Sequence, residues 1–272
     1  MNLGAGARSE GAWNSEYFEV RIDDEDRRVA WLTISRPEKL NVFVMGMRRE
    51  FARIFEYLER EERVRVVVVR GAGEKAFSAG GDVRGFLEVG PAELSCLHEN
   101  VAAPERFPGV VIAAVDGYCF GVGLEIALAC DFRVASSRAV FALPELRLGM
   151  IPGSGGTQRL VRFVGLGRAK EMVLRGRWVK AEEALTWGLV NEVVEPERLE
   201  AAAEGLAREI VALPALAVSV AKRVLNLSQE APLGVGLQLE GYAYGMLRGT
   251  PDFEEGVRAF LEKRQPRFSE RG

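Results

Sequence analysis

The stretch of residues 110–131, VVIAAVDGYCFGVGLEIALACD, constrains the fold of this 272-residue chain more than any other. A β-branched and apolar run leads into a glycine-rich turn, and the apolar run then resumes with one carboxylate, Glu125, embedded in it. This order predicts a buried strand, a tight turn and a helix beginning at Leu124. The first N–H groups of a helix lack intrahelical partners and favour negative charge in front of them. The turn is therefore a candidate active site, although such connections are also common structural elements of α/β proteins.

The same plan of strand, glycine-rich loop and helix start occurs earlier in the chain. Residues 64–71, VRVVVVRG, are typical of a strand covered on both faces, and the loop GAGEKAFSAGGDV and a short helical segment follow them. Residues 132–137 and 140–141 form a third strand region. Repeated units of this kind predict an α/β fold of stacked ββα or βαβ turns with largely parallel sheets.

The two ends of the chain have different patterns. Alternating apolar residues at 17–20 and 29–34 predict a β-hairpin, and residues 45–61 have the spacing of an amphipathic helix. Beyond Pro152, glycines and prolines separate a series of helices, and Thr250 followed by Pro251 predicts the cap of the last one. We expect a flexible N-terminal extension at residues 1–15, an α/β core with the active site at 16–199, and a helical region at 200–272.

Composition excludes several classes of protein. With 48% hydrophobic residues the chain can bury a large core. The 36 basic and 39 acidic residues give a net charge of −3, which offers no global electrostatic attraction to nucleic acid or anionic membranes and leaves a local basic patch open. No apolar run reaches the roughly 18 to 20 residues of a membrane span. The odd number of cysteines, Cys96, Cys119 and Cys130, without CxxC spacing, predicts reduced core thiols in a soluble, cytoplasmic protein.

Familiar cofactor and catalytic motifs are missing from the sequence. Ile126 stands where a dinucleotide fingerprint needs its third glycine, and no Walker spacing occurs. The single histidine, His98, lies in a polar stretch and is expected at the surface, which argues against a histidine-based triad. Clusters with metal-ligand spacing are also missing, so we expect no metal.

Two carboxylates in apolar segments remain, Glu125 and Glu145. Burial of a carboxyl group is costly, and it raises the pKa toward the range that is useful for proton transfer at neutral pH. The alternative is a structural role, in which both form hydrogen bonds or ion pairs with Arg133, Arg147 or Arg159. The pattern alone leaves both interpretations open.

Three motifs, KAFSAGGDV, AAVDGYCFGVGLEIALACDFRVAS and FALPELRLGMIPGSGGTQRLVR, occur in an order that resembles the crotonase superfamily, specifically its enoyl-CoA hydratase and isomerase branch. The resemblance extends over roughly residues 18–268. It implies a crotonase-like spiral of stacked ββα units with a C-terminal helical region. It also implies an acyl-CoA thioester substrate whose enolate oxygen is held by two backbone N–H groups, at Gly81 and Val122.

The resemblance also assigns roles to the two carboxylates. Glu145 is expected to exchange the proton at the α-carbon, and Glu125 to orient and activate water, which gives an enoyl-CoA hydratase. Family isomerases often use one carboxylate, so the pair favours hydration. The alternatives are a Δ3,Δ2-enoyl-CoA isomerase, a CoA-thioester hydrolase or C–C lyase on the same scaffold, and an RNA-binding member, against which the charge argues.

This chain departs from the family pattern at two places. Many relatives have three successive glycines where this chain has Gly121-Val122-Gly123, and we expect the valine to alter the acyl pocket. The usual LNAL is here residues 40–43, LNVF.

The resemblance further implies contacts with the CoA moiety and an oligomer. No separate cofactor is expected, because coenzyme A is part of the substrate, and relatives form trimers or hexamers, as dimers of trimers, through the C-terminal helices. The expected substrate- and CoA-binding positions are Lys39, Leu40, Ala79, Asp82, Val83, Arg84, Phe260 and Lys263.

Overall fold

The computed structural model describes residues 13, 15–60 and 63–269. The predicted N-terminal extension at residues 1–15 lies outside the described residues, apart from Trp13 and Ser15.

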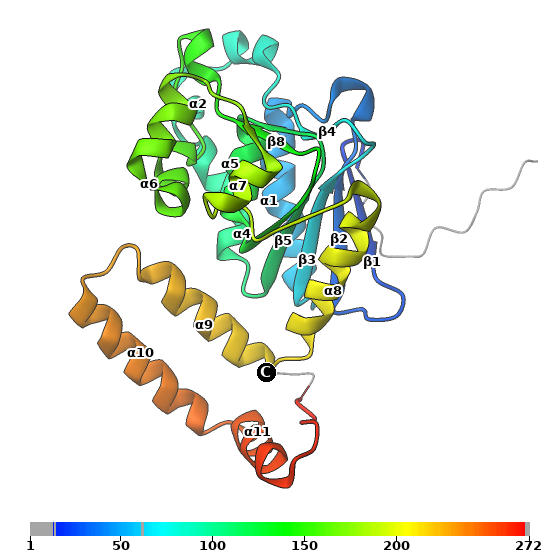
Figure 1. Cartoon of the computed structure of the whole chain (residues 1–272), viewed down its shortest axis with the longest axis vertical. Helices are drawn as coiled ribbons and strands as arrows, with labels where there is room; N and C mark the ends of the chain where they lie inside the picture. Colours follow the sequence, from blue (N-terminus) through cyan, green and yellow to red (C-terminus); the bar gives the residue numbers. More distant parts are fainter. Residues whose placement is uncertain (1–12, 14, 61–62, 270–272) are drawn as a thin grey trace, which may run out of the picture.

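Two sheets form the centre of the described part of the chain (Figure 1). The larger one has the strand order β1-β2-β3-β5-β7-β10 and the smaller one the order β4-β6-β8-β9. The strands of the larger sheet are β1 (Phe18–Ile22), β2 (Val29–Ile34), β3 (Val66–Gly71), β5 (Val110–Val115), β7 (Phe132–Ser136) and β10 (Glu192–Val194). Those of the smaller sheet are β4 (Ala76–Ser78), β6 (Tyr118–Phe120), β8 (Val140–Ala142) and β9 (Val179–Lys180).

The chain passes repeatedly from the larger sheet to the smaller one. A strand of the smaller sheet follows each of three strands of the larger one: β4 follows β3, β6 follows β5 and β8 follows β7. Within each sheet, these successive strands pair in parallel. This arrangement confirms the predicted mixed α/β fold of stacked units with largely parallel sheets. The N-terminal β1 and β2 are antiparallel, as the hairpin prediction required.

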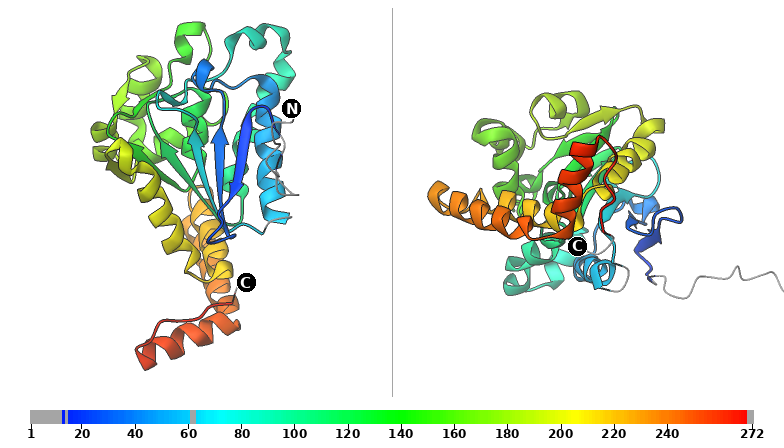
Figure 2. Two further views of the ribbon diagram at one scale, coloured as in Figure 1. Left: turned by 90° about the vertical axis from the view of Figure 1, so that its right-hand side faces the viewer. Right: turned by 90° about the horizontal axis from the view of Figure 1, so that it is seen from below.

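Helices cover both faces of the larger sheet, which explains why its central strands are almost wholly apolar. Alternate residues of a strand point to opposite faces. Val67 and Val69 belong to the same apolar cluster as Phe51 of α1 (Met45–Arg60), whereas Val66 and Val68 pack with α8 (Leu199–Val211). Figure 2 shows the sheet between these two helices.

The glycine-rich turn differs from its prediction. Residues 118–120 form β6, which pairs in parallel with β4 and β8, and helix α5 (Val122–Ala129) begins two residues before the expected Leu124. The sharp bends are confined to Gly117 and Gly121, whose φ angles are 62° and 52°. The short strand is stabilised by pairing with segments that are distant in sequence, so no local pattern marks it.

Cysteine placement also departs from expectation at one position. Cys119 and Cys130 are buried, as predicted, but Cys96 is exposed. It lies at the junction of two one-turn helices, α2 (Pro91–Ser95) and α3 (Leu97–Val101), where only Leu97 and Val101 of α3 are buried. His98 is exposed, as predicted.

The remaining helices follow the glycine and proline punctuation. The glycines at 165 and 167, which predict a boundary between two helices, lie inside one element, α6 (Gly156–Leu174), with a break at Gly165, where φ is 77°. The Thr250 hydroxyl accepts the N–H of Phe253 at 3.3 Å and caps the last helix, as predicted. The other helices in this half are α7 (Ala181–Thr186), α9 (Ala215–Leu227), α10 (Leu233–Arg248) and α11 (Pro251–Glu262).

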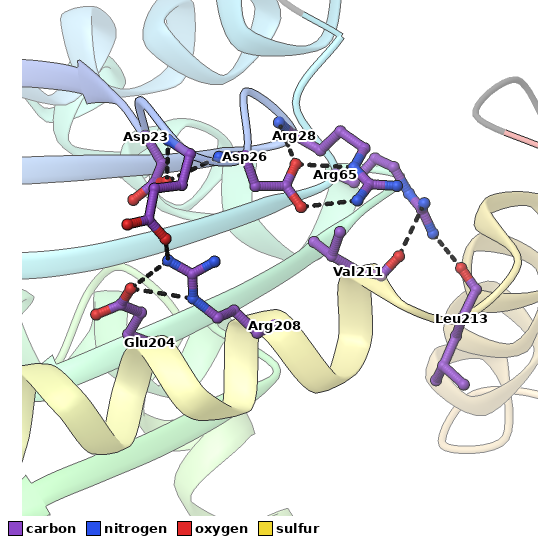
Figure 3. A network of polar contacts seen from close by, with 9 residues as sticks. Asp23, Asp26, Arg28, Arg65, Glu204, Arg208, Val211 and Leu213 are labelled. Atoms are coloured by element: carbon purple, nitrogen blue, oxygen red, sulfur yellow. Dashed lines mark hydrogen bonds and ion pairs between the residues drawn. The ribbon is translucent and has the colours of Figure 1, made fainter. Parts of the chain in front are cut away.

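Helices α9, α10 and α11 extend away from the sheets as an arm (Figures 1 and 2). Arg65, which precedes β3, fixes the start of the arm by donating to the carbonyls of Val211, at 3.1 Å, and Leu213 (Figure 3). Lys222 of α9 donates to the Asp131 carboxylate at 2.8 Å. The division of function near residue 200 stays a prediction.

The helices of the described residues vary in length and apolarity, the two properties that decide whether a helix can span a membrane. No single helix among them is both long and apolar enough to cross a bilayer, and only residues 196–211 and 215–227 together meet that test, as a pair bent by 106°.

Candidate active site

One cavity of about 350 Å³ lies where the two glycine-rich turns and the segment before α6 meet. It is lined by side chains or backbone from both turns, from α1 and from the loop that follows β8. The predicted site residues among its lining are Ala79, Gly81, Val83, Val122, Glu125 and Glu145.

The two predicted oxyanion donors lie on adjacent turns. A Cβ placed on Gly121 would be 3.4 Å from Cα of Gly80, so the turns are in close contact. Val122 is the first residue of α5, and its N–H therefore has no acceptor within the helix. Within the described residues, neither the N–H of Gly81 nor that of Val122 donates a hydrogen bond. Both turns thus offer a free backbone donor beside the cavity.

The structure explains why a valine is accepted between two glycines. The left-handed φ angle belongs to Gly121, at 52°, whereas Val122 has ordinary helical geometry. A Cβ on Gly123 would lie 2.7 Å from Cβ and from the carbonyl oxygen of Ser78. Only positions 121 and 123 require glycine, and the Val122 side chain contributes to the cavity wall.

Glu125 is held rigidly from the side of α6. Glu125 belongs to α5, and only 2% of the residue is exposed. Its Oε1 accepts the N–H groups of Ser154, at 2.7 Å, and Gly156, at 3.0 Å. Gly156 begins the 19-residue helix α6, so the positive end of the helix dipole faces this carboxylate. The hydrogen bonds fix one oxygen and leave the carboxylate directed at the cavity.

Glu145 has a contrasting environment. It begins a 3₁₀ turn (Glu145–Leu148), and its Oε2 is buried without a hydrogen-bond partner among the described residues. Burial, with a smaller contribution from the charge of Glu125, raises the pKa of Glu145 to about 7. A carboxyl group with this pKa exchanges protons readily near neutral pH.

A purely structural role for these carboxylates, as ion-pair partners of nearby arginines, is wrong for Arg133 and Arg159. Arg133 donates to the carbonyls of Leu189, Ala127 and Cys130, and Arg159 pairs with Glu105. Neither of the two arginines bonds to Glu125 or Glu145 within the described part of the chain.

Arg48 was missed by the sequence reasoning. It lines the cavity from α1, only 4% of it is exposed, and Nη1 donates to the Ser154 hydroxyl at 3.2 Å. The signal was present, because Arg48 lies three residues before Phe51, on the apolar face of an otherwise regular amphipathic helix.

Comparison with known proteins identifies the family. The enoyl-CoA hydratase/isomerase family model matches residues 24–271. This chain is a member of that family. It is 39% identical to the short-chain-enoyl-CoA hydratase of Clostridium acetobutylicum, over 90% of this chain and 95% of that protein. It is 35% identical to the crotonyl-CoA hydratase of Syntrophomonas wolfei, over 92% and 98%.

Solved structures of enoyl-CoA hydratase/isomerase family members share the fold. The enoyl-CoA hydratase of Bacillus anthracis superposes with a TM-score of 0.87, with 37% identity, and the match covers 93% of this chain and 99% of that one. A Geobacillus kaustophilus relative gives a TM-score of 0.88, also at 37% identity, over 93% and 98%. The crotonase-like spiral predicted from the motifs is therefore confirmed.

Several CoA-binding positions proposed from family resemblance lie close to the cavity. The Leu40 carbonyl accepts the N–H of Ala79 at 2.9 Å, which joins the loop containing Lys39 to the first glycine-rich turn. Asp82 and Arg84 pair with each other at 2.7 Å, and this pairing lowers the pKa of Asp82 to about 2. The Arg84 charge is thus paired with Asp82 within this chain, and both Arg84 and Lys39 are exposed.

Two further CoA-binding positions proposed for this family member are not brought to the cavity within one chain. Phe260 and Lys263 are on and just after α11, which lies at the opposite end of the molecule from α5 and β8 (Figure 1). Any contact of theirs with CoA would have to involve another copy of the chain.

The described residues contain no candidate metal centre of protein side chains. No group of three or more His, Cys, Asp or Glu side chains there is arranged to hold a metal ion. The expectation that this family member uses neither a metal nor a separate cofactor stays a prediction.

Proposed function

We propose that this protein is an enoyl-CoA hydratase, which adds water reversibly to a 2-enoyl-CoA and gives a 3-hydroxyacyl-CoA. The observation that carries the proposal is that two carboxylates and two free backbone donors line one cavity. The substrate class is supported by the names of relatives, among them the hydratases of Clostridium acetobutylicum and Syntrophomonas wolfei.

The proposed reaction assigns one task to each group. The oxygen of water bonds to C3 of the enoyl group while one of its protons passes to Glu125. The electron pair of the C2=C3 bond forms a C1=C2 bond, and the π pair of the carbonyl moves onto the thioester oxygen, to which Gly81 and Val122 donate their N–H groups. The enolate then takes a proton at C2 from Glu145. Throughout the cycle the two carboxyl groups together retain one proton.

The environments of the two carboxylates suit these tasks. The hydrogen bonds from Ser154 and Gly156 hold Glu125 in one orientation, as a group that positions water must be. Glu145, with a pKa of about 7, suits a proton donor to carbon. A double-bond shift needs one carboxylate only, so the second, fixed carboxylate favours hydration. Incubation with a 3-enoyl-CoA separates the two reactions. An isomerase would convert it to the conjugated 2-enoyl-CoA without hydrating the product.

The proposal includes three features of the protein beyond the reaction. No redox or metal cofactor takes part, because amides and carboxylates carry all the developing charge. The protein works in the cytoplasm, which the free, buried thiols of Cys119 and Cys130 support. It assembles as a trimer or a dimer of trimers, supported by the exposed apolar residues of the arm.

Substitution of each carboxylate tests the proposal. We expect Glu125→Gln and Glu145→Gln each to lower kcat for crotonyl-CoA hydration by about 10² to 10⁴, the usual contribution of a general acid or base. Glutamine keeps the shape, and its carbonyl can still accept from Ser154 and Gly156. Glu230→Gln, at an exposed position between α9 and α10, is the matched control. Near-native turnover in both active-site variants would refute the assignment.

A further inference from the structure

A buried cation faces the acyl cavity, and the proposed reaction does not use it. Arg48 extends from α1 to the cavity, where its Nη2 would lie 3.3 Å from a Cβ placed on Gly81. Its charge is therefore beside one of the two proposed oxyanion donors. Among the cavity-lining residues in the described part of the chain, Arg48 is the sole cation.

The guanidinium is only partly satisfied by the protein. Nη1 donates to the Ser154 hydroxyl at 3.2 Å, but within the described residues Nη2 has no acceptor and Nε is buried without one. Burial lowers the pKa of Arg48, because desolvation opposes the charged form, although an arginine remains protonated. A buried charge with unused donors is costly to the folded protein unless something else pairs with it.

Glu125 does not form an ion pair with the Arg48 guanidinium. Its field reaches Arg48, but within the described residues the Arg48 side chain donates to Ser154 and not to Glu125, whose Oε1 accepts backbone N–H groups instead. Glu125 already has two N–H donors and the N-terminus of α6. The unused side of the guanidinium therefore remains available to a group that enters the cavity.

We infer that Arg48 selects acyl groups that carry a carboxylate, so that the preferred substrate is a short 2-enoyl-CoA with a free carboxylate at or near its far end. This inference rests on the proposed function and deepens it. A carboxylate matches the planar donor pattern of arginine better than any other acyl substituent. Phe86, Leu94 and Leu97 line the same cavity and offer apolar surface to the carbons between the thioester and that carboxylate.

A matched pair of substrates tests the inference on the wild-type protein. Glutaconyl-CoA and trans-2-pentenoyl-CoA have the same chain length, and the first has a carboxylate where the second has a methyl group. We expect kcat/KM to favour glutaconyl-CoA at least tenfold, on the order of a charge-assisted hydrogen bond. A wild-type preference for pentenoyl-CoA, in turnover and in binding, would overturn the inference without any variant.

Substitutions then assign the preference to Arg48. In Arg48→Leu the ratio of kcat/KM for glutaconyl-CoA over pentenoyl-CoA should fall about 100-fold or more, because the carboxylate then enters an apolar site. Arg48→Lys keeps the charge without the planar fork, so we expect an intermediate ratio, which also decides the matter should Arg48→Leu fail to fold. Arg49→Leu, at the neighbouring exposed arginine, should leave the ratio unchanged. Equal losses for both substrates in the Arg48 variants would mean that Arg48 only balances Glu125, and would overturn the inference.

Binding of saturated analogues separates this inference from the proposed function. Calorimetry with glutaryl-CoA and pentanoyl-CoA needs no turnover. A preference for glutaryl-CoA that is lost in Arg48→Leu supports carboxylate recognition, whether or not the wild-type protein hydrates the enoyl thioesters. If the wild-type protein shows this preference but hydrates neither glutaconyl-CoA nor pentenoyl-CoA, only the hydratase proposal is refuted. Hydration of both substrates, with no preference for glutaryl-CoA, would refute carboxylate recognition alone.

Discussion

The two candidate catalytic carboxylates differ because of what surrounds each oxygen. Glu125 accepts two backbone N–H groups at the start of α6, whereas Glu145 is buried with one oxygen unpartnered within the described residues. Two protein amides replace water around Oε1 of the first group, whereas among the described residues no donor replaces water at Oε2 of the second. Two residues of the same type thereby acquire different chemistry from their positions alone.

The raised pKa of Glu145 has a consequence for stability. Below the unfolded-state value of about 4.5, the group is protonated in both states and pH has no effect through it. As pH rises from about 4.5 to about 7, the unfolded chain ionises first, so the folded state loses relative stability, and the loss is constant above pH 7.

Glu145→Gln removes this penalty. The difference in free energy of unfolding between the variant and the wild type should be near zero at pH 4. It should rise to about 3 kcal/mol in favour of the variant at pH 8. Urea denaturation at several pH values measures the difference, and Glu230→Gln serves as the exposed control. A difference that is the same at all pH values would contradict the assigned pKa.

At the scale of elements, the site depends on how closely α5 approaches β4. Gly123 lies in α5 directly over Ser78 at the end of β4, with no room for a Cβ. The strand-to-helix turn can therefore place Val122 beside Gly81 only when residue 123 has no side chain.

Matched glycine substitutions test this packing. Gly123→Ala should cost about 1–3 kcal/mol of stability through overpacking and should also weaken turnover by displacing the Val122 donor. Gly205→Ala, at an exposed position within α8 that is open to solvent, should instead stabilise the protein by roughly 0.5–1 kcal/mol. Thermal and urea unfolding measure both, and a stabilised Gly123→Ala variant would contradict the packing described.

Elements with a strong local pattern could be predicted from the sequence. The β-branched runs became β3 and β5, and the spacing of apolar residues became α1. Strand β6 could not be predicted, because three residues between two glycines form a strand only through pairing with β4 and β8. At the site, motif resemblance placed both glutamates at the cavity, but Arg48 was overlooked because charged residues of an amphipathic helix usually face solvent.

At the scale of the whole molecule, the arm stands out among the described residues because little of it is covered. No residue of α10 is buried, and the sole buried residue of α9 is Lys222, whose Nζ also donates to the carbonyls of Pro104 and Gly109. Polar contacts thus fix the start of the arm, whereas apolar side chains such as Tyr242, 75% exposed, and Phe260, 83% exposed, remain uncovered. Such a surface is typical of a subunit interface.

Light scattering tests whether the arm forms an interface. The wild-type protein should have a molar mass three or six times that of the 29.9 kDa chain. Tyr242→Asp combined with Tyr244→Asp should shift the mass toward that of one chain, because each charge would be buried unpaired. Glu56→Arg, at an exposed position on α1, is the control. A wild-type protein that is monomeric at micromolar concentration would contradict the proposed assembly.

The central claim is that water is added to an enoyl thioester between Glu125 and Glu145. Mass spectrometry of crotonyl-CoA after incubation with the wild-type protein in water enriched in oxygen-18 tests it most directly. The account predicts 3-hydroxybutyryl-CoA containing one oxygen-18 atom, formed far more slowly by Glu125→Gln and Glu145→Gln. Recovery of unchanged crotonyl-CoA, or of free CoA and crotonate from thioester hydrolysis, would contradict it.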